Sequence, residues 1–260
     1  MSKPGFVSGS VTPPGEEGQA AERPLARTRS FTRRGGRLNE RQQSAWDELA
    51  STYVLDVPRG GPSTSVDPGF ELDLEATFGR RAPLVVEIGS GRGEAVVAAA
   101  LEHPERDFLA LEVYQPAVAS TLSRCSRAGV ENVRIAVVNA VEALTLLLAP
   151  GSIDQLLIYF PDPWHKSRHH KRRLVNDAFA DLAASRIRLG GELRLATDWE
   201  DYALQMRTVL DPHPAFSNRF DGWAPRQEIR PLTKFEQKGL AKGRTIRDLV
   251  YLRQGSDDHR

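Results

Sequence analysis

Residues 84–97 read LVVEIGSGRGEAVV, a short aliphatic run followed by a glycine-rich turn and a second aliphatic run. The first run, residues 84–88, has the length and composition of a buried parallel strand. Gly89, Gly91 and Gly93 then permit positive φ angles and allow the backbone to approach a ligand closely. The stretch therefore predicts a strand, a ligand-binding loop and a helix in succession, the first unit of an α/β sheet.

The glycine pattern excludes two familiar nucleotide-binding loops. A dinucleotide fingerprint that began at Gly89 would need its third glycine at the position of Glu94. A Walker A loop fails because no Gly-Lys-Ser/Thr follows. The observed E-x-G-x-G-x-G, which begins at Glu87, resembles the motif I loop of class I S-adenosylmethionine-dependent methyltransferases. A purely structural turn remains the alternative, since glycine-rich turns between a strand and a helix are common.

Aliphatic runs alternate with helical patterns through the middle of the chain. The predicted strands are residues 84–88, 108–113, 133–138, 153–160 and 193–196, and the predicted helices are residues 94–102, 115–127, 141–148 and 174–188. This alternation predicts an α/β fold with a doubly wound, mostly parallel sheet of the Rossmann-like class. Beyond Asp198 the pattern weakens, although residues 245–253 have the composition of one further strand.

Composition narrows the class of protein. The 260 residues carry 35 Lys+Arg and 34 Asp+Glu, and the formal net charge of +1 excludes a polyanion-binding protein that acts through bulk charge. The single cysteine, Cys125, excludes a disulfide framework and a multi-cysteine metal site. No stretch approaches the ~20 apolar residues of a membrane span, and the N-terminus lacks the apolar core of a secretion signal. We therefore expect a cytoplasmic protein without a membrane contact.

Residues 1–38 differ in composition from the rest. They are rich in Pro, Gly, Ser, Glu and Arg, so they cannot bury enough apolar surface to offset the entropy of ordering. We expect a disordered tail, basic from Arg23 onward, ahead of a folded methyltransferase domain over residues 39–260. Asn39 is placed to cap a helix that runs to about residue 50. The basic stretch is either a solvated linker or an arm that contacts phosphates.

Polar side chains are expected where three of the predicted strands end. Glu112 lies at the end of the second strand, about twenty residues after the glycine loop, where a carboxylate can accept hydrogen bonds from both hydroxyls of a ribose. Glu87 ends the first strand and is expected to face the charged amino-acid end of such a ligand. Asn139 and Ala140 end the third strand, where enzymes of this kind commonly place a side chain near the adenine amino group. The alternative for Glu112 is a surface carboxylate.

The sequence FPDPWHK at residues 160–166 follows the fourth predicted strand. Prolines on both sides restrict the backbone around Asp162, so its carboxylate is expected to be rigidly held. Trp164 offers a flat face for stacking on a base. His169 and His170 lack Cys or acidic partners at ligand spacing, so no metal site is expected. The basic residues of this segment are expected to contact RNA phosphates, and the predicted phosphate track comprises Arg168, Lys171, Arg172 and Arg173, with Lys166 beside it.

Four blocks together resemble one family. They are RSFTRRGGRL at 29–38, FPDPWHKSRHHKRR at 160–173, ATDW at 196–199 and TKFE at 233–236. In this order they are similar to signature blocks of the bacterial tRNA (guanine-N7-)-methyltransferase family, and the similarity extends over about residues 29–254. The resemblance implies a class I methyltransferase fold, S-adenosylmethionine as cofactor, tRNA as partner, and methylation of N7 of a guanine in the tRNA variable loop.

The resemblance also implies roles for particular residues. Cofactor contacts are implied for Glu87, Gly89, Gly91, Gly93, Glu112, Asn139, Ala140 and Asp162. Substrate contacts are implied for Lys166, Asp198, Thr233, Lys234, Phe235 and Glu236. Asp162 holds the catalytic position. Asn139 is a departure, since family members usually carry Asp there; its amide oxygen still accepts a hydrogen bond but lacks the charge, so weaker cofactor binding is expected.

Guanine N7 carries an in-plane lone pair and no proton, so its methylation needs no general base. We expect alignment of N7 with the methyl group, and stabilisation by Asp162 of the positive charge that develops on the purine. Asp198 is expected to accept hydrogen bonds from N1–H and the amino group of the guanine, and the alternative role for Asp198 is a helix N-cap. The alternative for residues 233–236 is the start of a helix. Two other functions stay open: methylation of another RNA base nitrogen, and RNA binding with a vestigial cofactor site. No protein partner is indicated.

Overall fold

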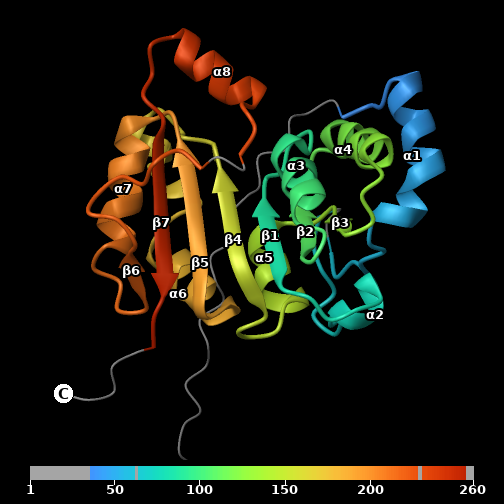
Figure 1. Cartoon of the computed structure of the whole chain (residues 1–260), viewed down its shortest axis with the longest axis horizontal. Coiled ribbons are helices and arrows are strands. Elements are labelled where there is room, and N and C mark those ends of the chain that lie inside the picture. Colours follow the sequence, from blue (N-terminus) through green and yellow to red (C-terminus); the bar gives the residue numbers. More distant parts are fainter. Residues whose placement is uncertain (1–35, 62–63, 228–229, 256–260) are drawn as a thin grey trace, which may run out of the picture.

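The computed structural model describes residues 36–61, 64–227 and 230–255. These residues form a seven-stranded sheet in the order β3-β2-β1-β4-β5-β7-β6 (Figure 1). The strands are β1 (Leu84–Ile88), β2 (Asp107–Leu111), β3 (Val133–Ala136), β4 (Ile153–Tyr159), β5 (Ile187–Thr197), β6 (Phe216–Asn218) and β7 (Arg247–Arg253). Strands β1 to β5 are parallel, whereas β7 runs antiparallel to both β5 and β6.

Helices precede β1, connect the parallel strands and flank β6. They are α1 (Glu40–Tyr53), α2 (Leu74–Phe78), α3 (Glu94–Glu102), α4 (Gln115–Ala128), α5 (Ala140–Glu142), α6 (Asp177–Arg186), α7 (Glu200–Leu210) and α8 (Lys234–Ala241), with a π-helical turn η1 (Ala143–Leu147) and a 3₁₀ turn η2 (Ser167–Arg172). In Figure 1, α1 lies beside α4 at one end of the sheet, and α8 lies above β4 and β5 at the edge where those strands end. No helix in the described ranges has the length and apolar character to cross a membrane.

Alternate residues of β1 face two separate apolar clusters. Val85 belongs to a cluster that includes Val96 of α3 and Val118 of α4. Leu84 and Val86 belong to a second cluster, which includes residues of α6 and α7 on the opposite face. Burial on both faces explains why the strand reads as an unbroken aliphatic run. The doubly wound sheet that the sequence predicts is confirmed.

The chain changes direction along the sheet between β1 and β4. It proceeds from β1 outward to β2 and β3, then returns to pair β4 with the other side of β1. In open α/β sheets, ligands bind outside the carboxyl ends of the strands at such a point. The carboxyl ends of β2, β1 and β4 therefore lie next to one another, and the predicted cofactor residues Glu87, Glu112 and Asp162 lie at these ends.

The helix predicted after Asn39 is confirmed. α1 begins at Glu40, and Asn39 and Gln42 each accept a hydrogen bond from the other's backbone N–H, a reciprocal cap that satisfies two otherwise unpaired donors. α1 ends at Tyr53, slightly beyond the predicted end. Residues 1–35, which make up most of the predicted disordered tail, lie outside the described residues.

Several elements differ from the prediction. α6 and β5 meet at Ile187 instead of forming one helix over 174–188, because Asn176 caps the helix through the Phe179 amide and the backbone is already extended at Ile187. The prediction also lacks α2 and β6, and it gives the starts of α7 and α8 only as alternatives for Asp198 and residues 233–236. α7 follows Asp198, where the apolar pattern weakens. The helix nevertheless buries one face, which consists of Tyr202, Ala203, Met206 and Leu210.

Cys125 lies on α4 inside the cluster around Val118. It is fully buried and forms no disulfide. Burial raises the pKa of its thiol to about 12, because the thiolate would lose its hydration. The sole cysteine is therefore a core residue.

Candidate active site

Three carboxylates gather at the carboxyl edge of the sheet. Glu87 stands near the end of β1, Glu112 directly after β2, and Asp162 directly after β4. Glu112 lies close enough to Glu87 to raise the pKa of that carboxyl, and Asp162 acts in the same direction on Glu112. When ionised, three acidic groups at adjacent strand ends create a region of negative potential that favours a cationic ligand.

The glycine loop between β1 and α3 has two functions. Gly89, Gly91 and Gly93 all have positive φ, at 71°, 57° and 74°. A Cβ on Gly93 would lie 2.5 Å from Cγ2 of Thr121, so this glycine lets α3 and α4 pack closely. A Cβ on Gly89 would meet nothing within 4 Å, so the space above this glycine is open to a ligand. Gly93 thus supports the packing and Gly89 borders the site.

Glu112 fastens this loop. Its Oε2 accepts a hydrogen bond from the Gly91 amide at 2.8 Å, and its Oε1 accepts from the amides of Val113 and Tyr114, both at 2.8 Å. Burial raises the pKa of the Glu112 carboxyl, while the three amides oppose that shift. Oε1 already accepts from two amides, whereas Oε2 accepts from one and keeps a second lone pair, so Glu112 can hold the loop and still accept a hydroxyl donor at Oε2.

Glu87 is a buried acid without a full set of partners. Its exposed fraction is 4%, and its Oε2 has no hydrogen-bond partner. Burial raises the pKa of the Glu87 carboxyl to about 8, with a smaller contribution from Glu112. A buried acceptor of this kind suits the ammonium group of an amino-acid ligand, which would supply both the missing hydrogen bond and a compensating charge. The residues present therefore fit S-adenosylmethionine.

We expect cofactor affinity to rise with pH up to about 8. Below that value Glu87 is protonated in the free protein, and a bound cation favours the ionised carboxylate. Binding therefore releases a proton, and affinity increases by up to about tenfold per pH unit. Glu87→Gln should abolish the proton release, which titration calorimetry in two buffers of different ionisation enthalpy measures directly.

A matched control for this variant is Glu75→Gln, an exposed glutamate on α2. The stability of the fold offers a second readout. The raised pKa makes the Glu87 contribution to the free energy of unfolding complete below about 4.5 and lost as the pH rises through about 8. The Gln variant should therefore gain stability relative to the wild type at alkaline pH. Equal proton release from both proteins would contradict the assignment.

The Asn139 side chain caps a short helix, a role that the sequence did not reveal. Its Oδ1 accepts from the amides of Val141 and Glu142, at 2.9 and 3.2 Å, and so caps α5. The Asn139 amide donates to the carbonyl of Thr64 at 2.7 Å, which ties the end of β3 to the segment that follows α1. The contact of Asn139 and Ala140 with an adenine amino group stays a prediction.

The loop that carries Asp162 is strained on both sides. Phe160 and Trp164 have φ angles of 51° and 45°, although neither is a glycine. Each such residue costs of order 1–3 kcal/mol and persists only where the surroundings hold it. Between them, Pro161 and Pro163 fix their own φ angles. The Asp162 side chain is exposed, so this rigid turn presents a carboxylate to solvent beside Glu112.

The basic segment after Asp162 divides into exposed and buried cations. Lys166, Arg168, Lys171 and Arg172 are exposed along and beside η2. The Arg172 guanidinium lies 5.0 Å from the Trp164 ring centre, a cation–π contact. Arg173 differs from the expectation: only 1% of its side chain is exposed, so it cannot be a surface contact for phosphates in this arrangement.

The remaining predicted substrate residues lie on two elements above the sheet edge. Asp198 does not cap α7, whose N-cap is Trp199; its Oδ2 instead accepts from Arg244 Nη1 at 2.7 Å. Thr233 caps α8 through the Glu236 amide, as the alternative of a helix start anticipated. Glu236 is fully buried. The side chains of Lys234 and Phe235 lie outside what the structure describes, and substrate contact by these residues stays a prediction.

Glu236 belongs to an ion-pair network that joins α8 to the sheet. It accepts from Arg226 at 2.8 Å and from Arg230 at 3.1 Å, and Arg230 also pairs with Asp248 of β7. The Arg230 guanidinium lies 5.3 Å from the ring of Phe160, at the base of the Asp162 loop. Sequence reasoning missed Arg226, Arg230 and Arg244, because their partners come from other elements and no local spacing marks them.

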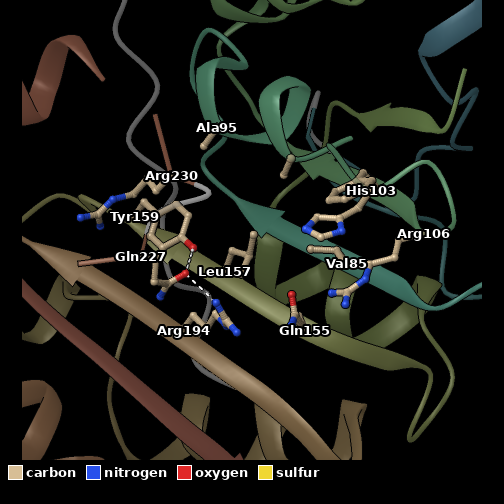
Figure 2. A pocket seen from close by; sticks show the side chains of 12 residues that line it. Val85, Ala95, His103, Arg106, Gln155, Leu157, Tyr159, Arg194, Gln227 and Arg230 are labelled. Atoms are coloured by element: carbon tan, nitrogen blue, oxygen red, sulfur yellow. Dashed lines mark hydrogen bonds between the residues drawn. The ribbon is translucent and has the colours of Figure 1, made fainter. Parts of the chain in front are cut away.

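A separate cavity of about 110 Å³ lies on the α3 face of the sheet (Figure 2). Val85 and Leu157 line it, and at one side of it Tyr159 donates a hydrogen bond to Gln227 at 3.0 Å. Its Arg194 is already paired with Glu192 at 2.6 Å. The three carboxylates do not line this cavity, which is therefore distinct from the site at the strand ends. Across the described ranges, no group of three or more His, Cys, Asp or Glu side chains is arranged to hold a metal ion.

The fold and the carboxylates at the strand ends define a class I methyltransferase. The 16S rRNA methyltransferase KamB superposes with a TM-score of 0.52 at 15% identity, over 72% of this chain and 96% of that one. A variant of the 16S rRNA (adenine(1408)-N(1))-methyltransferase from Catenulisporales acidiphilia, solved with its cosubstrate SAM, superposes with a TM-score of 0.50 at 17% identity, over 78% and 99% of the two chains. At these identities the likeness shows the fold alone.

Sequence comparison is more specific. Residues 81–249 match a family described as a putative methyltransferase. The tRNA (guanine-N(7)-)-methyltransferase of Cutibacterium acnes is 52% identical over 86% of this chain and 82% of its own length. That of Paraburkholderia xenovorans is 43% identical over 96% and 90%. This chain belongs to the tRNA (guanine-N7-)-methyltransferase family, as the sequence blocks predict.

Proposed function

We propose that this protein transfers a methyl group from S-adenosylmethionine to N7 of a guanine in the variable loop of tRNA, in the cytoplasm. The observation that carries the proposal is the position of the three carboxylates, which border an exposed basic segment at the same edge of the sheet. A cationic cofactor and a polyanionic substrate are thereby given neighbouring sites. Residues 39–260 are the methyltransferase domain in this proposal, and residues 1–38 are a basic tail.

The cofactor supplies an electrophilic methyl group, and the protein's residues position it and the base. Guanine N7 loses no proton, so no residue has to act as a general base. Alignment of the two reactants accounts for roughly 7–11 kcal/mol of the barrier in well-oriented reactions. Asp162, exposed on a rigid turn, stabilises the positive charge that develops on the purine.

The residue roles in the proposal follow the family resemblance and the geometry. Glu87, Gly89, Gly91, Gly93, Glu112, Asn139, Ala140 and Asp162 hold the cofactor; Lys166, Asp198, Thr233, Lys234 and Phe235 contact the substrate; and Lys166, Arg168, Lys171 and Arg172 neutralise phosphates. Asp198 is engaged by Arg244, so the guanine has to share or displace that contact. Glu236, which is fully buried, acts through the placement of α8.

Methyl transfer to defined tRNAs tests the proposed function. Labelled S-adenosylmethionine should deliver one methyl group to a tRNA with a guanine in its variable loop, and nucleoside analysis should identify 7-methylguanosine. The same tRNA with adenine at that position should accept no label. Label on another nitrogen, or at a guanine outside the variable loop, would reject the proposed target. Binding of tRNA without any transfer would indicate an RNA-binding protein instead.

Neutralising two exposed cations should make tRNA binding less sensitive to salt. Lys166→Gln combined with Arg168→Gln removes two phosphate contacts and the counterions they release, so the slope of log K against log salt should fall by about 1.8, or about 1.4 for a single-stranded contact. Filter binding over a salt series measures the slope. The control is the double variant Arg81→Gln with Arg188→Gln. Both arginines are exposed and lie at the amino ends of strands, Arg81 just before β1 and Arg188 near the start of β5. Equal slopes in the two double variants would contradict the phosphate track.

A further inference from the structure

Arg173 lies buried between the loop that carries Asp162 and helix α7. Its Nε donates to the carbonyl of Pro163 at 2.9 Å. Its Nη1 donates to Oε1 of Gln205 at 2.6 Å, and its Nη2 to Oδ2 of Asp201 at 2.5 Å. Every nitrogen of the guanidinium therefore has an acceptor, one in the loop and two on the helix.

The contact with Pro163 falls at the strained part of the loop. Pro163 follows Asp162 directly, and the positive φ angles of Phe160 and Trp164 bracket the pair. Residues in such conformations relax to ordinary angles unless neighbouring contacts prevent it. The Arg173 guanidinium supplies a contact that an isolated loop would lack, because the guanidinium is also bound to Gln205 and Asp201 outside the loop.

The anchor is the first half of α7. The Arg173 guanidinium stacks 4.8 Å from the ring centre of Tyr202. The hydroxyl of Tyr202 accepts from the Val175 amide at 3.1 Å, and Gln205 Nε2 donates to the Val175 carbonyl at 3.2 Å. The segment after Arg173 is thus held on the same helix, so the guanidinium is fixed from both sides.

We propose that Arg173 is a positioning residue for methyl transfer: it holds the Pro161–Pro163 backbone so that the Asp162 carboxylate keeps its place beside Glu112. The proposal rests on the proposed role of Asp162 at the reacting base. It requires the planar fork of an arginine, because three acceptors in different directions are bound at once. Arg173 acts through Asp162 and touches neither cofactor nor RNA.

The test compares Arg173→Gln with Arg168→Gln. For Arg173→Gln we expect single-turnover transfer at saturating tRNA and cofactor to slow by about 10²-fold, as small displacements at a reacting centre do. Its cofactor and tRNA affinities should change by less than about threefold, and the salt slope of tRNA binding should not change, because no phosphate contact is lost. Arg168→Gln, in contrast, should lower that slope by about 0.7–0.9, because it does lose a phosphate contact.

Two further variants separate positioning from general stability. Arg80→Gln is the matched control, because the Arg80 guanidinium also binds a carboxylate, that of Asp107, and a proline carbonyl, but at the opposite edge of the sheet. It should lower the melting temperature and leave the transfer rate unchanged. Arg173→Lys keeps the charge beside Asp201 and should recover part of the rate, since an ammonium can reach one acceptor but not three.

Folding is expected to survive the loss of the guanidinium, because the Asp201 side chain is 62% exposed and remains hydrated. Should Arg173→Gln nevertheless fail to fold, Arg173→Lys undergoes the same measurements. The proposal is overturned by a lower salt slope, by unchanged transfer, by an equal loss of cofactor affinity, or by the same rate loss in Arg80→Gln. A wild-type product outside the variable loop would reject the proposed target but would leave this comparison of rates intact.

Discussion

Asp162→Asn is expected to slow methyl transfer to saturating tRNA by 10²-fold or more, the usual cost of losing one preorganised electrostatic group. The substitution keeps the shape of the side chain and removes its charge, so the positive charge that develops on the purine loses its counter-charge. The affinity for tRNA should change by less than about threefold, because a carboxylate gains nothing from nearby phosphates. Rapid-quench transfer and filter binding measure the two quantities separately.

The control for Asp162→Asn is Asp47→Asn, an exposed aspartate on α1 that should leave both quantities unchanged. The pH dependence provides a second check. Since N7 has no proton to lose, the transfer rate at saturating substrates should not rise through the range in which histidines titrate. Equal losses of affinity and rate in Asp162→Asn would show that binding and charge stabilisation are not separate functions of this edge of the sheet.

Glu112→Ala is expected to weaken the binding of S-adenosylmethionine by about 10- to 150-fold, the range for a lost hydrogen bond to a charged group. The structure supports an effect at the upper end. Glu112 accepts from the amides of Gly91, Val113 and Tyr114, so the variant loses a ligand contact and also the fastening of the glycine loop. Titration calorimetry measures the affinity.

A melting curve shows whether Glu112→Ala remains folded, and binding of tRNA in the absence of cofactor should be unaffected. Glu112→Gln helps to apportion the loss. The glutamine side chain has one acceptor oxygen and one donor nitrogen, so it can replace only one of the two accepting oxygens of Glu112. The cofactor affinity of Glu112→Gln should therefore fall between those of Glu112→Ala and the wild type. Wild-type affinity in Glu112→Ala would mean that the carboxylate only holds the loop and that the ligand lies elsewhere.

Local patterns in the sequence account for most of the fold. The run Leu84–Ile88 is buried on both faces, and Asn39 caps α1 through chemistry that involves only neighbouring residues. Both signals arise within a few positions of the chain. The order of the strands places Glu87 and Glu112 at the same edge, so these positions also followed from the sequence.

Long-range contacts account for the rest. Arg173 reads as one more cation of a basic run, yet the acceptors that bury it come from α7, about thirty residues later. Asn139 reads as a ligand contact, yet its oxygen first satisfies the amides of a short helix. The same type of side chain is exposed at Arg172 and buried at Arg173. Only tertiary packing distinguishes such cases.

Because Cys125 is buried, the native protein is nearly unreactive toward thiol reagents. With a thiol pKa of about 12 and no solvent access, the residue presents almost no thiolate at neutral pH. A maleimide dye would then report only on a cysteine introduced at an exposed site, such as Leu101→Cys, where the side chain is 62% exposed. In the unmodified chain, Cys125 can react only when α4 opens, so its slow rate of labelling measures that opening. α4 is the helix that Gly93 allows to pack closely on the cofactor loop.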